Sequence, residues 1–427
     1  MLTPEAVAEK LIQKPVPHIL VDSDKKMHGW WAGKRECTGE RMLINPYNGC
    51  TLRCFFCYAN ALNWGYFGLF SRDNVVTVFD GYDSAVAKQL DSIDVASCGY
   101  LSPITDPFQP LEEHYHLSEK IIGEFVKRNI PVEFITKGKV PDTVFPLIAK
   151  QEHSFGQFTV LTPDESLRKR MVFGGSATTE ELFASMKRMS STINEKTGKG
   201  VHTVCRIDPI IPYVTSGRDM LRELLDMASE AGASHIIASC MDIPVSIKQK
   251  ALRFLYRLNP DPEYPFEKLY CETIDGDLHA NISFRKKLFT FMRDEAGARG
   301  MTFSLCMEYE KSDPFEVEVT GGKRRTVRCV GLNREFMTSE NCEGINIPIY
   351  VRNGDSTYPD GNGGARYSFV PAAGCDGNCL TCAEPRCGVE ELAMGRAVST
   401  RKDFTYSDYR RWSKERALEE QKELKLF

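Results

Sequence analysis

Long apolar runs are missing from this sequence of 427 residues. No uncharged apolar segment reaches the roughly 18 residues of a membrane span, so no membrane partner is expected. The first residues lack the charged-then-apolar pattern of a secretory signal, which predicts a cytoplasmic protein. An excess of positive charge is missing too, because the net charge is −4 and the pI is about 6.1. A large basic face is therefore not expected, and nucleic acid is not the expected partner.

Cysteine, in contrast, is abundant, with 15 residues in the chain. In a secreted domain this number would indicate disulfides, but in a long chain without a secretory signal it favours metal binding. The cysteines are unevenly distributed, since three lie within residues 50–57 and four within residues 375–387. The others are mostly isolated, and an isolated buried cysteine usually serves as a small packing residue.

The first group, Cys50, Cys54 and Cys57, has the spacing C-x3-C-x2-C, with the aromatic Phe56 just before the last cysteine. Three thiolates so spaced can ligate three irons of a 4Fe-4S cluster and leave the fourth iron without a protein ligand. A metal position left open to a small molecule is typical of catalytic rather than structural sites. The motif therefore predicts a catalytic iron–sulfur centre.

Short apolar runs of the length of buried parallel strands alternate with amphipathic stretches from residue 42 onward. The expected strands are 42–44, 97–102, 132–136, 157–161, 202–207, 235–239 and 302–306. Helical patterns lie between them, for example at 118–129 and 219–231. This repetition predicts an α/β fold built as a partial TIM-like barrel. The barrel is expected at 42–310, after a lead-in at 1–41 and before a small cysteine-rich C-terminal extension at 311–427.

Polar residues follow the expected strands at the ends where barrel enzymes place their chemistry. Any one of them could be polar simply because a loop begins there. As a set they would ring one mouth, and they are assigned to cofactor binding: Ser102, Asp106, Lys137, Thr162 and Arg206.

The cysteine spacing with its aromatic resembles the signature of the radical S-adenosylmethionine (radical SAM) enzymes. The resemblance implies a partial (β/α)6 barrel, S-adenosylmethionine (SAM) at the open iron, and an external one-electron donor such as flavodoxin or ferredoxin. Three further runs, Thr105–Glu112, Ile135–Lys137 and Arg206–Pro212, resemble the branch related to spore photoproduct lyase. The similarity covers roughly residues 42–215, under half of the chain.

The resemblance also implies roles for single residues. Lys137 and Thr162 would contact the methionine carboxylate of SAM, Ser102 and Asp106 would lie near its amino group, and Phe56 would pack near the adenine. These residue types suit the task, because a zwitterionic amino acid needs a cation for its carboxylate and oxygen acceptors for its ammonium group.

In one respect the chain departs from that branch. The match implies a hydrogen-donor cysteine just before the Thr/Ser-Asp step of the second strand, where this chain has Ser102-Pro103. Cys98 lies several residues earlier and is a poor substitute. Together with the acidic pI, this argues against repair of thymine dimers.

The second cysteine group has the spacing C-x3-C-x2-C-x4-C among glycine and proline, and comprises Cys375, Cys379, Cys382 and Cys387. Such a loop can wrap a metal. It resembles the C-terminal cluster domains of many radical SAM enzymes, which implies an auxiliary 4Fe-4S cluster; a structural zinc knuckle is the alternative. Four cysteines would leave no metal position open to a small molecule, so the cluster would transfer electrons or stabilise the fold.

Three other residues are candidates for catalysis. Cys306 ends an expected strand near the mouth and could donate a hydrogen atom, although core packing is the ordinary role of such a cysteine. Glu112 and Glu308 are candidates for a general base.

The expected function is that of a radical SAM oxidoreductase or lyase that abstracts a hydrogen atom from a small natural-product or carbohydrate-like substrate, by dehydrogenation, dehydration or rearrangement. A barrel mouth suits such a compact substrate. Modification of a ribosomal peptide is the alternative, but the residues before the barrel look too few for a leader-binding domain. Nucleic-acid repair or modification is disfavoured by charge. An electron carrier would need no open three-cysteine site.

Overall fold

The computed structural model describes residues 4–22, 25, 27, 41–93, 95–96, 98–319, 323–339, 341–348, 350–352 and 366–369. The second cysteine group, with Cys375, Cys379, Cys382 and Cys387, lies outside the described residues. None of the helices in the described part has the length and apolarity that a membrane crossing requires.

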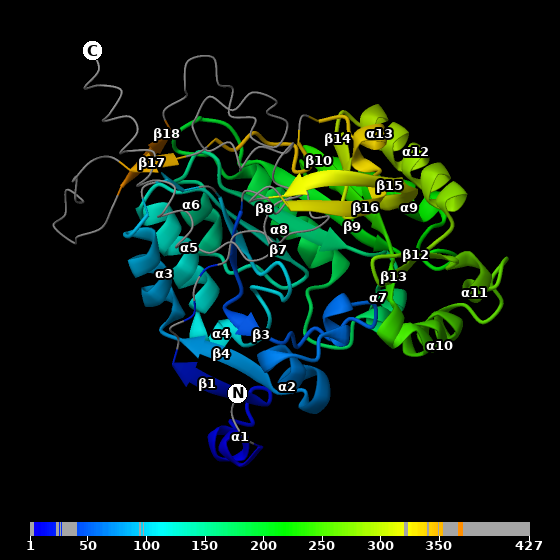
Figure 1. Cartoon of the computed structure of the whole chain (residues 1–427). Coiled ribbons are helices and arrows are strands. Elements are labelled where there is room, and N and C mark those ends of the chain that lie inside the picture. The colour runs from blue at the N-terminus through cyan, green and yellow to red at the C-terminus, as the bar shows by residue number, and fades with distance from the viewer. Residues whose placement is uncertain are drawn as a thin grey trace.

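A seven-stranded parallel sheet forms the body of the protein (Figure 1). Its strands are β2 (Met42–Ile44), β6 (Gly99–Leu101), β7 (Val132–Thr136), β8 (Phe155–Val160), β9 (Thr203–Ile210), β10 (His235–Cys240) and β14 (Thr302–Leu305). They lie side by side in chain order, from β2 at one edge to β14 at the other, and each neighbouring pair is parallel. The predicted partial TIM-like α/β barrel is confirmed, with seven strands where six units were expected.

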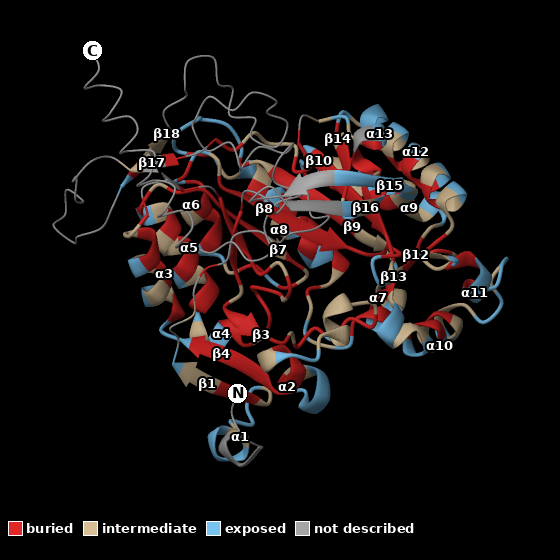
Figure 2. Ribbon diagram, in the orientation of Figure 1, coloured by how far each residue is buried: buried red, intermediate tan, exposed pale blue. Residues whose placement is uncertain are grey.

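Helices in the crossovers cover the outer face of this sheet, and they bury one face each while the other faces solvent (Figure 2). They are α3 (Tyr82–Leu90), α5 (Leu117–Lys127), α6 (Val144–Ile148), α7 (Glu165–Met171), α8 (Thr179–Ser191), α9 (Arg218–Glu230) and α12 (Ile282–Ala298). In α5, Ile121, Ile122 and Phe125 are fully buried at the spacing of one helical face. A Cβ on Gly99 would lie 2.5 Å from a ring carbon of Phe125, so glycine lets α5 lie close to β6.

Smaller elements flank the sheet. The small elements of the N-terminal part are α1 (Pro4–Lys10), β1 (His18–Asp22), β3 (Tyr47–Asn48), the 3-10 helix η1 (Tyr58–Ala61), α2 (Gly65–Asp73), β4 (Val76–Asp80) and α4 (Glu112–Tyr115). Strand β1 pairs with β4, and β4 with β3, so part of the lead-in belongs to the same body as the barrel. Between β10 and α12 lie β11 (Ile243–Pro244), η2 (Val245–Ile247), α10 (Lys248–Leu258), α11 (Phe266–Leu269), β12 (Glu272–Ile274) and β13 (Asp277–His279).

The chain beyond β14 returns to the barrel. A long hairpin of β15 (Tyr309–Val319) and β16 (Lys323–Gly331) leads to α13 (Asn333–Phe336). Later, β17 (Tyr350–Arg352) pairs with β18 (Tyr367–Phe369) and with β5 (Val95–Ala96). The boundary predicted at residue 310 stays a prediction, but the described residues after it contact the barrel extensively.

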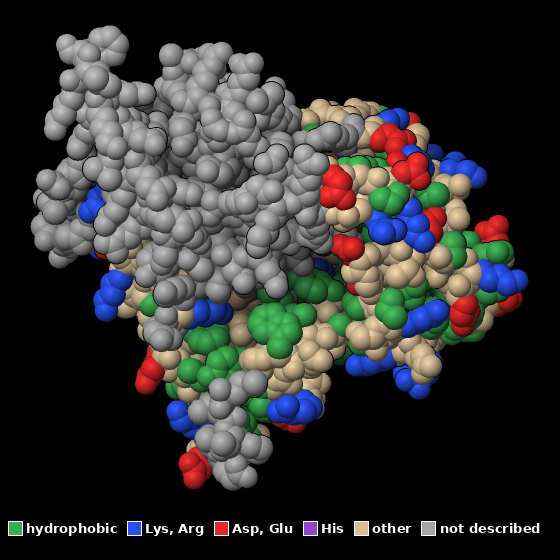
Figure 3. All heavy atoms as spheres, in the orientation of Figure 1, with side chains coloured by type: hydrophobic (Ala, Val, Ile, Leu, Met, Phe, Trp, Pro, Cys, Tyr) green, Lys and Arg blue, Asp and Glu red, His purple; other side chains and the backbone are tan. Residues whose placement is uncertain are grey.

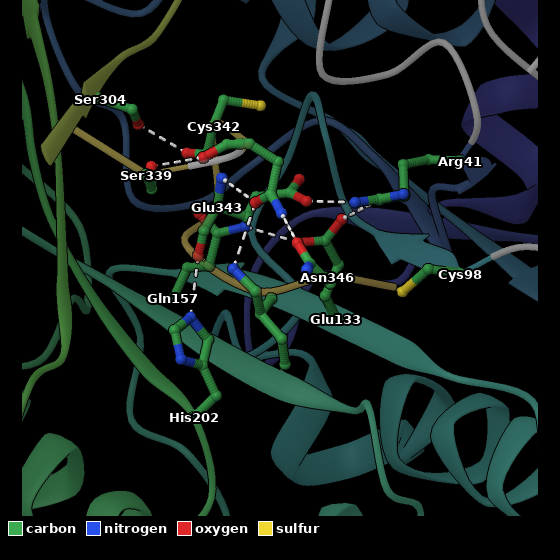
Figure 4. A network of polar contacts seen from close by, with 12 residues as sticks. Arg41, Cys98, Glu133, Gln157, His202, Ser304, Ser339, Cys342, Glu343 and Asn346 are labelled. Atoms are coloured by element: carbon green, nitrogen blue, oxygen red, sulfur yellow. Dashed lines mark hydrogen bonds and ion pairs between the residues drawn. The ribbon is translucent and has the colours of Figure 1, made fainter. Parts of the chain in front are cut away.

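Residues 341–347, here called the inner segment, fill the barrel at the N-terminal ends of its strands (Figure 4). The carbonyl of Cys342 accepts hydrogen bonds from Ser304 Oγ at 2.6 Å and lies 3.1 Å from Nε2 of His235. The carbonyl of Glu343 lies 2.8 Å from Nε2 of His202. The inner segment therefore closes the end of the barrel opposite the predicted cofactor mouth.

The Glu343 side chain meets two charges inside this end of the barrel. Arg41 donates to Glu343 and, through Nε, to Glu133 Oε1 at 3.1 Å, and all three side chains are at most 3% exposed. Burial and the nearby Glu343 raise the pKa of Glu133 well above its ordinary value. Gln157 Nε2 donates to the second oxygen of Glu133 at 2.6 Å. One guanidinium thus serves two buried carboxylates.

Replacement of Arg41 by methionine should destabilise the protein by about 3–5 kcal/mol, because Glu133 and Glu343 would be left buried without their cation. Chemical denaturation of the full chain measures this change. The control is Lys286→Met, which removes a cation from the exposed pair with Glu335 and should cost under about 1 kcal/mol. Equal losses in the two variants would contradict the role given to Arg41.

Candidate iron–sulfur and cofactor site

The three cysteines of the first group lie in the loop that leaves the C-terminal end of β2 and, after the short β3, continues to η1. Gly49 takes a φ of +97°, a left-handed backbone conformation that favours glycine. The amide of Cys57 donates to the carbonyl of Cys54 at 3.3 Å, and Arg53 donates in the same way to Cys50 at 3.4 Å. The loop therefore folds back on itself and keeps the cysteines together.

Two segments, one after β6 and one after α7, clamp this cysteine loop. From the loop after β6, Gln109 accepts from the Thr51 amide at 3.1 Å and donates to the Gly49 carbonyl at 3.3 Å. From the segment after α7, Gly174 donates to the Leu52 carbonyl at 2.9 Å. A Cβ on Gly174 would lie only 1.7 Å from the Thr51 carbonyl oxygen, so only glycine fits there.

Gln109 and Gly174 were not predicted from the sequence. Gln109 stands inside the run Thr105–Glu112 that carried the resemblance, and Gly174 begins a Gly-Gly pair. Both signals were visible, but neither shows which loop the residue contacts.

The three thiols are close enough to influence one another. Burial raises the pKa of Cys50 well above its ordinary value, with further contributions from Asp106 and Cys54. Burial also raises the pKa of Cys57, and that of Cys54 to about 12, although the Lys137 ammonium opposes both shifts. Thiolates here need a strong cationic partner, and iron provides one.

In the described residues, no three His, Cys, Asp or Glu side chains gather tightly enough to hold a single metal ion. A four-iron cluster keeps its ligands further apart than a single ion does, because each cysteine binds a different iron. Three mutually interacting thiols, of which Cys54 is buried and Cys50 and Cys57 are half-buried, fit a cluster with one open iron better than a mononuclear site.

Lys137 ends β7 on the cysteine side of the mouth. Its Nζ lies 5.9 Å from the ring centroid of Phe56, and its charge acts on Cys54, Cys57 and Asp208. A cation between the open-iron site and the barrel interior is well placed for the carboxylate of an amino-acid cofactor. The predicted roles of Lys137 and Phe56 fit this placement, though no bound cofactor tests them.

Asp106 orients the Lys137 backbone. Its Oδ2 accepts from the Lys137 amide at 2.7 Å, and its Oδ1 accepts from Thr136 Oγ1 at 2.8 Å and the Phe108 amide at 2.9 Å. Burial raises its pKa despite these donors. Asp106 therefore ties the loop after β6 to the end of β7, and its predicted contact with the SAM amino group stays a prediction.

Ser102 and Thr162 differ in their surroundings. Ser102 has a φ of 59° and a buried Oγ without a hydrogen-bond partner, at the end of β6. Thr162 Oγ1 accepts from the Asp164 amide at 3.1 Å and contacts Met220 Sδ at 3.5 Å. The geometry thus leaves Ser102 available to a ligand, whereas Thr162 already helps to form the start of α7.

Arg206 lies on β9, deeper in the barrel than Lys137. Its Nη1 donates to Gln157 Oε1 at 2.9 Å and its Nη2 to Asp208 Oδ2 at 2.5 Å. Asp208 also accepts from Ser239 Oγ. Burial would lower the pKa of Arg206, but the neighbouring Cys306 and Asp208 outweigh burial and raise it. Cys306, directly after β14, is half-buried and packs against the apolar cluster that contains Val204 and Ile237.

The two candidate general bases are fully engaged. Glu112 accepts from the Ser118 and Glu119 amides at 3.0 and 2.9 Å and from the Tyr47 hydroxyl, so it caps the start of α5. Glu308 accepts from the Cys240 amide at 2.6 Å and from Arg285 Nη1 at 2.8 Å. Burial raises the pKa of Glu308 to about 8, against the opposing effect of Arg285. Their contacts are those of structural carboxylates, and the catalytic roles predicted for them stay untested.

Comparison with known proteins gives the following relatives. No family model matches the chain. The chain is 26% identical over 400 residues to a radical SAM Nalpha-GlyT isomerase of Pseudomonas phage M6, covering 90% of this chain and 77% of that protein. It is 24% identical over 239 residues to an uncharacterized protein of Mycobacterium tuberculosis, covering 54% of this chain and 67% of that protein.

Two solved structures are similar to lower degree. A spore photoproduct lyase mutant with bound AdoMet and dinucleoside spore photoproduct has a TM-score of 0.49 at 13% identity, covering 67% of this chain and 81% of that one. Streptococcus suis SuiB bound to the precursor peptide SuiA has a TM-score of 0.40 at 12% identity, covering 62% and 48%. The phage relative confirms the resemblance to radical SAM enzymes that the cysteine motif indicated.

Replacement of Gln109 by alanine should loosen the cysteine loop, because the amides and carbonyls it holds would lose their partners. We expect loss of iron to a chelator to be about tenfold faster, which corresponds to the roughly 1 kcal/mol of a net hydrogen bond. Absorbance of the reconstituted cluster follows this loss. The matched control is Gln249→Ala on the exposed face of α10. Unchanged cluster retention in the Gln109 variant would contradict the clamp.

Proposed function

We propose that this radical SAM enzyme removes a hydrogen atom from a small substrate at the barrel mouth and converts it to an isomer. The observation that carries the proposal is the placement of three mutually interacting, buried or half-buried thiols near the Lys137 ammonium at the C-terminal ends of the strands. Isomerisation is preferred among the expected reactions because the phage relative, similar over most of the chain, is named as an isomerase.

Cys50, Cys54 and Cys57 would hold three irons, Lys137 would bind the carboxylate of SAM, and the buried Ser102 hydroxyl would bind its amino group. When bound, the cluster and SAM supply a deoxyadenosyl radical that removes hydrogen from an unactivated carbon. The protein's part is to orient the substrate carbon and to exclude other hydrogen donors.

The inner segment supports a compact substrate. Residues 341–347 cover the N-terminal end of the barrel through bonds to His202 and Ser304, so the substrate is proposed to bind at the opposite end, at the mouth. The surface charge also favours a compact substrate over a nucleic acid. On the described part of the face in Figure 3, Lys and Arg are interspersed with Asp and Glu. A small natural-product or carbohydrate-like compound therefore remains the preferred substrate class, ahead of a ribosomal peptide or a nucleic acid.

Cys306 is proposed as the hydrogen donor that ends the rearrangement. Its S–H bond breaks homolytically, the hydrogen atom forms a C–H bond on the rearranged carbon radical, and the sulfur keeps the unpaired electron. One electron from the external donor and one proton from solvent then restore the thiol. Its half-buried position directly after β14, at the end of the strands where the mouth lies, supports this role.

Cys54→Ala should abolish SAM cleavage to deoxyadenosine, because one iron ligand of the open cluster is lost. Anaerobic assay of deoxyadenosine with a chemical reductant measures this. Cys271→Ala, at an exposed cysteine, is the control and should retain activity. Cleavage that persists in Cys54→Ala would refute the site.

The same samples test the second cysteine group, which we propose holds an auxiliary cluster through Cys375, Cys379, Cys382 and Cys387. Wild-type protein should then contain about eight iron and eight sulfide per chain, and the Cys54 variant about four of each. About four iron with one zinc in the wild type would assign that loop to a zinc knuckle.

Cys306→Ser should separate SAM cleavage from product formation. Deuterium transfer into deoxyadenosine first identifies a substrate from candidate pools. In deuterated water the thiol exchanges, so wild-type enzyme should place solvent deuterium on the product, whereas the serine variant should still form deoxyadenosine but no deuterated product. Equal deuterium in both products would assign the hydrogen atom to another exchangeable donor, and a wild-type product without deuterium would show that deoxyadenosine returns the hydrogen.

A further inference from the structure

Two buried polar atoms on neighbouring strands have no hydrogen-bond partner. They are Nε of Arg206 on β9 and Oγ1 of Thr159 on β8, and their residues are 6% and 1% exposed. Polar atoms buried to this degree nearly always have a partner, in the protein, in ordered water or in a ligand. Because these two atoms lie on neighbouring strands, they could share one ligand.

The two residues share the inner face of the sheet. Thr159 is paired in register with Arg206 on the adjacent parallel strand. Gln157 lies two residues before Thr159, hence on the same face, and it bonds both Arg206 and Glu133, the partner of Arg41. The intervening Phe158 and Cys205 belong to the large apolar core instead. Thr159 and Arg206 thus face the barrel interior side by side.

The other two nitrogens of the Arg206 guanidinium each have a partner. Nη1 donates to Gln157 and Nη2 to Asp208, which also accepts from Ser239. These two bonds fix the orientation of the guanidinium and leave its Nε–H without a partner in the described residues. A preorganised donor of this kind binds an oxygen acceptor at little conformational cost.

Arg206 is connected with the cofactor side of the mouth, because its partner Asp208 is also influenced by the Lys137 ammonium. Arg206 was predicted from the sequence to bind the cofactor. In the proposed function Lys137 and Ser102 bind the amino-acid part of SAM, which leaves the Arg206–Thr159 pair for the substrate.

We propose that Arg206 and Thr159 bind a carbonyl oxygen of the substrate, belonging to a carboxylate or an amide, next to the carbon that loses its hydrogen atom. This inference rests on the proposed function and names its substrate class. The C–H bond breaks homolytically, the hydrogen leaves with the deoxyadenosyl group, and the unpaired electron is shared between the carbon and the carbonyl oxygen. The Arg206 N–H and the Thr159 hydroxyl stabilise the electron density on that oxygen.

The test is a fluorine NMR titration of the full-length, anaerobically reconstituted protein, saturated with SAM and not reduced. The probes are trifluoroacetate for a carboxylate, trifluoroacetamide for an amide, and trifluoroethanol as a probe without a carbonyl. We expect one or both carbonyl probes to bind, with affinity lowered about tenfold in Arg206→Gln and about threefold in Thr159→Val, as expected for one charged and one neutral hydrogen bond. Whichever carbonyl probe binds more tightly identifies the substrate group.

The control variant is Arg222→Gln on the outer helix α9, where Arg222 is 44% exposed. It should leave probe binding unchanged. SAM binding is followed separately, by its effect on the electron paramagnetic resonance signal of the reduced cluster, and should be unchanged in Arg206→Gln and Thr159→Val.

Three results would overturn the inference: carbonyl probes that do not bind, probes that bind equally to all variants, or SAM affinity that falls with Arg206→Gln. The last result would return Arg206 to the cofactor site. Thr159→Val is nearly isosteric and keeps the test valid if the arginine variant fails to fold. Because the titration needs no turnover, its failure is distinct from a failure of SAM cleavage in the proposed function.

Discussion

Every charge inside the barrel needs a partner, and this requirement determines much of the structure. Arg41 holds Glu133 and Glu343 at one end, although Arg41 and Glu343 are 302 positions apart. Because an uncompensated buried charge is costly, the inner segment has to return to the barrel to complete the set. That return also closes the end through which a long substrate could otherwise pass.

At the mouth of the barrel, the need to pair buried charges acts on the thiols of the first cysteine group. Cys54 is buried, Cys50 and Cys57 are half-buried, and the pKa values of all three thiols are raised. Lys137 offsets part of this effect for Cys54 and Cys57, and its backbone is fixed by Asp106. In the proposed function iron would supply the positive charge that thiolates at this position need.

The sequence was informative where the signal was local. Apolar runs located all seven strands, and the spacing of Cys50, Cys54 and Cys57 indicated the chemistry, because both patterns lie within a few residues. The inner segment carries no periodic pattern, and the partner of Glu343 lies in the lead-in, so neither could be predicted. Gln109 was missed for a related reason: its role depends on two backbone groups of another loop.

The hydrogen-bond partners of a polar residue also distinguish a structural role from a functional one better than its residue type does. Glu112 and Glu308 were attractive as acids near strand ends, but each has both carboxylate oxygens occupied by backbone amides or by Tyr47 and Arg285. Arg206 and Thr159 lie equally deep, yet each has an atom without a partner. Other buried polar atoms of the described residues also lack a partner, but these two lie in register on neighbouring strands and face the barrel interior. Their incomplete bonding is explained if the substrate supplies the missing acceptor.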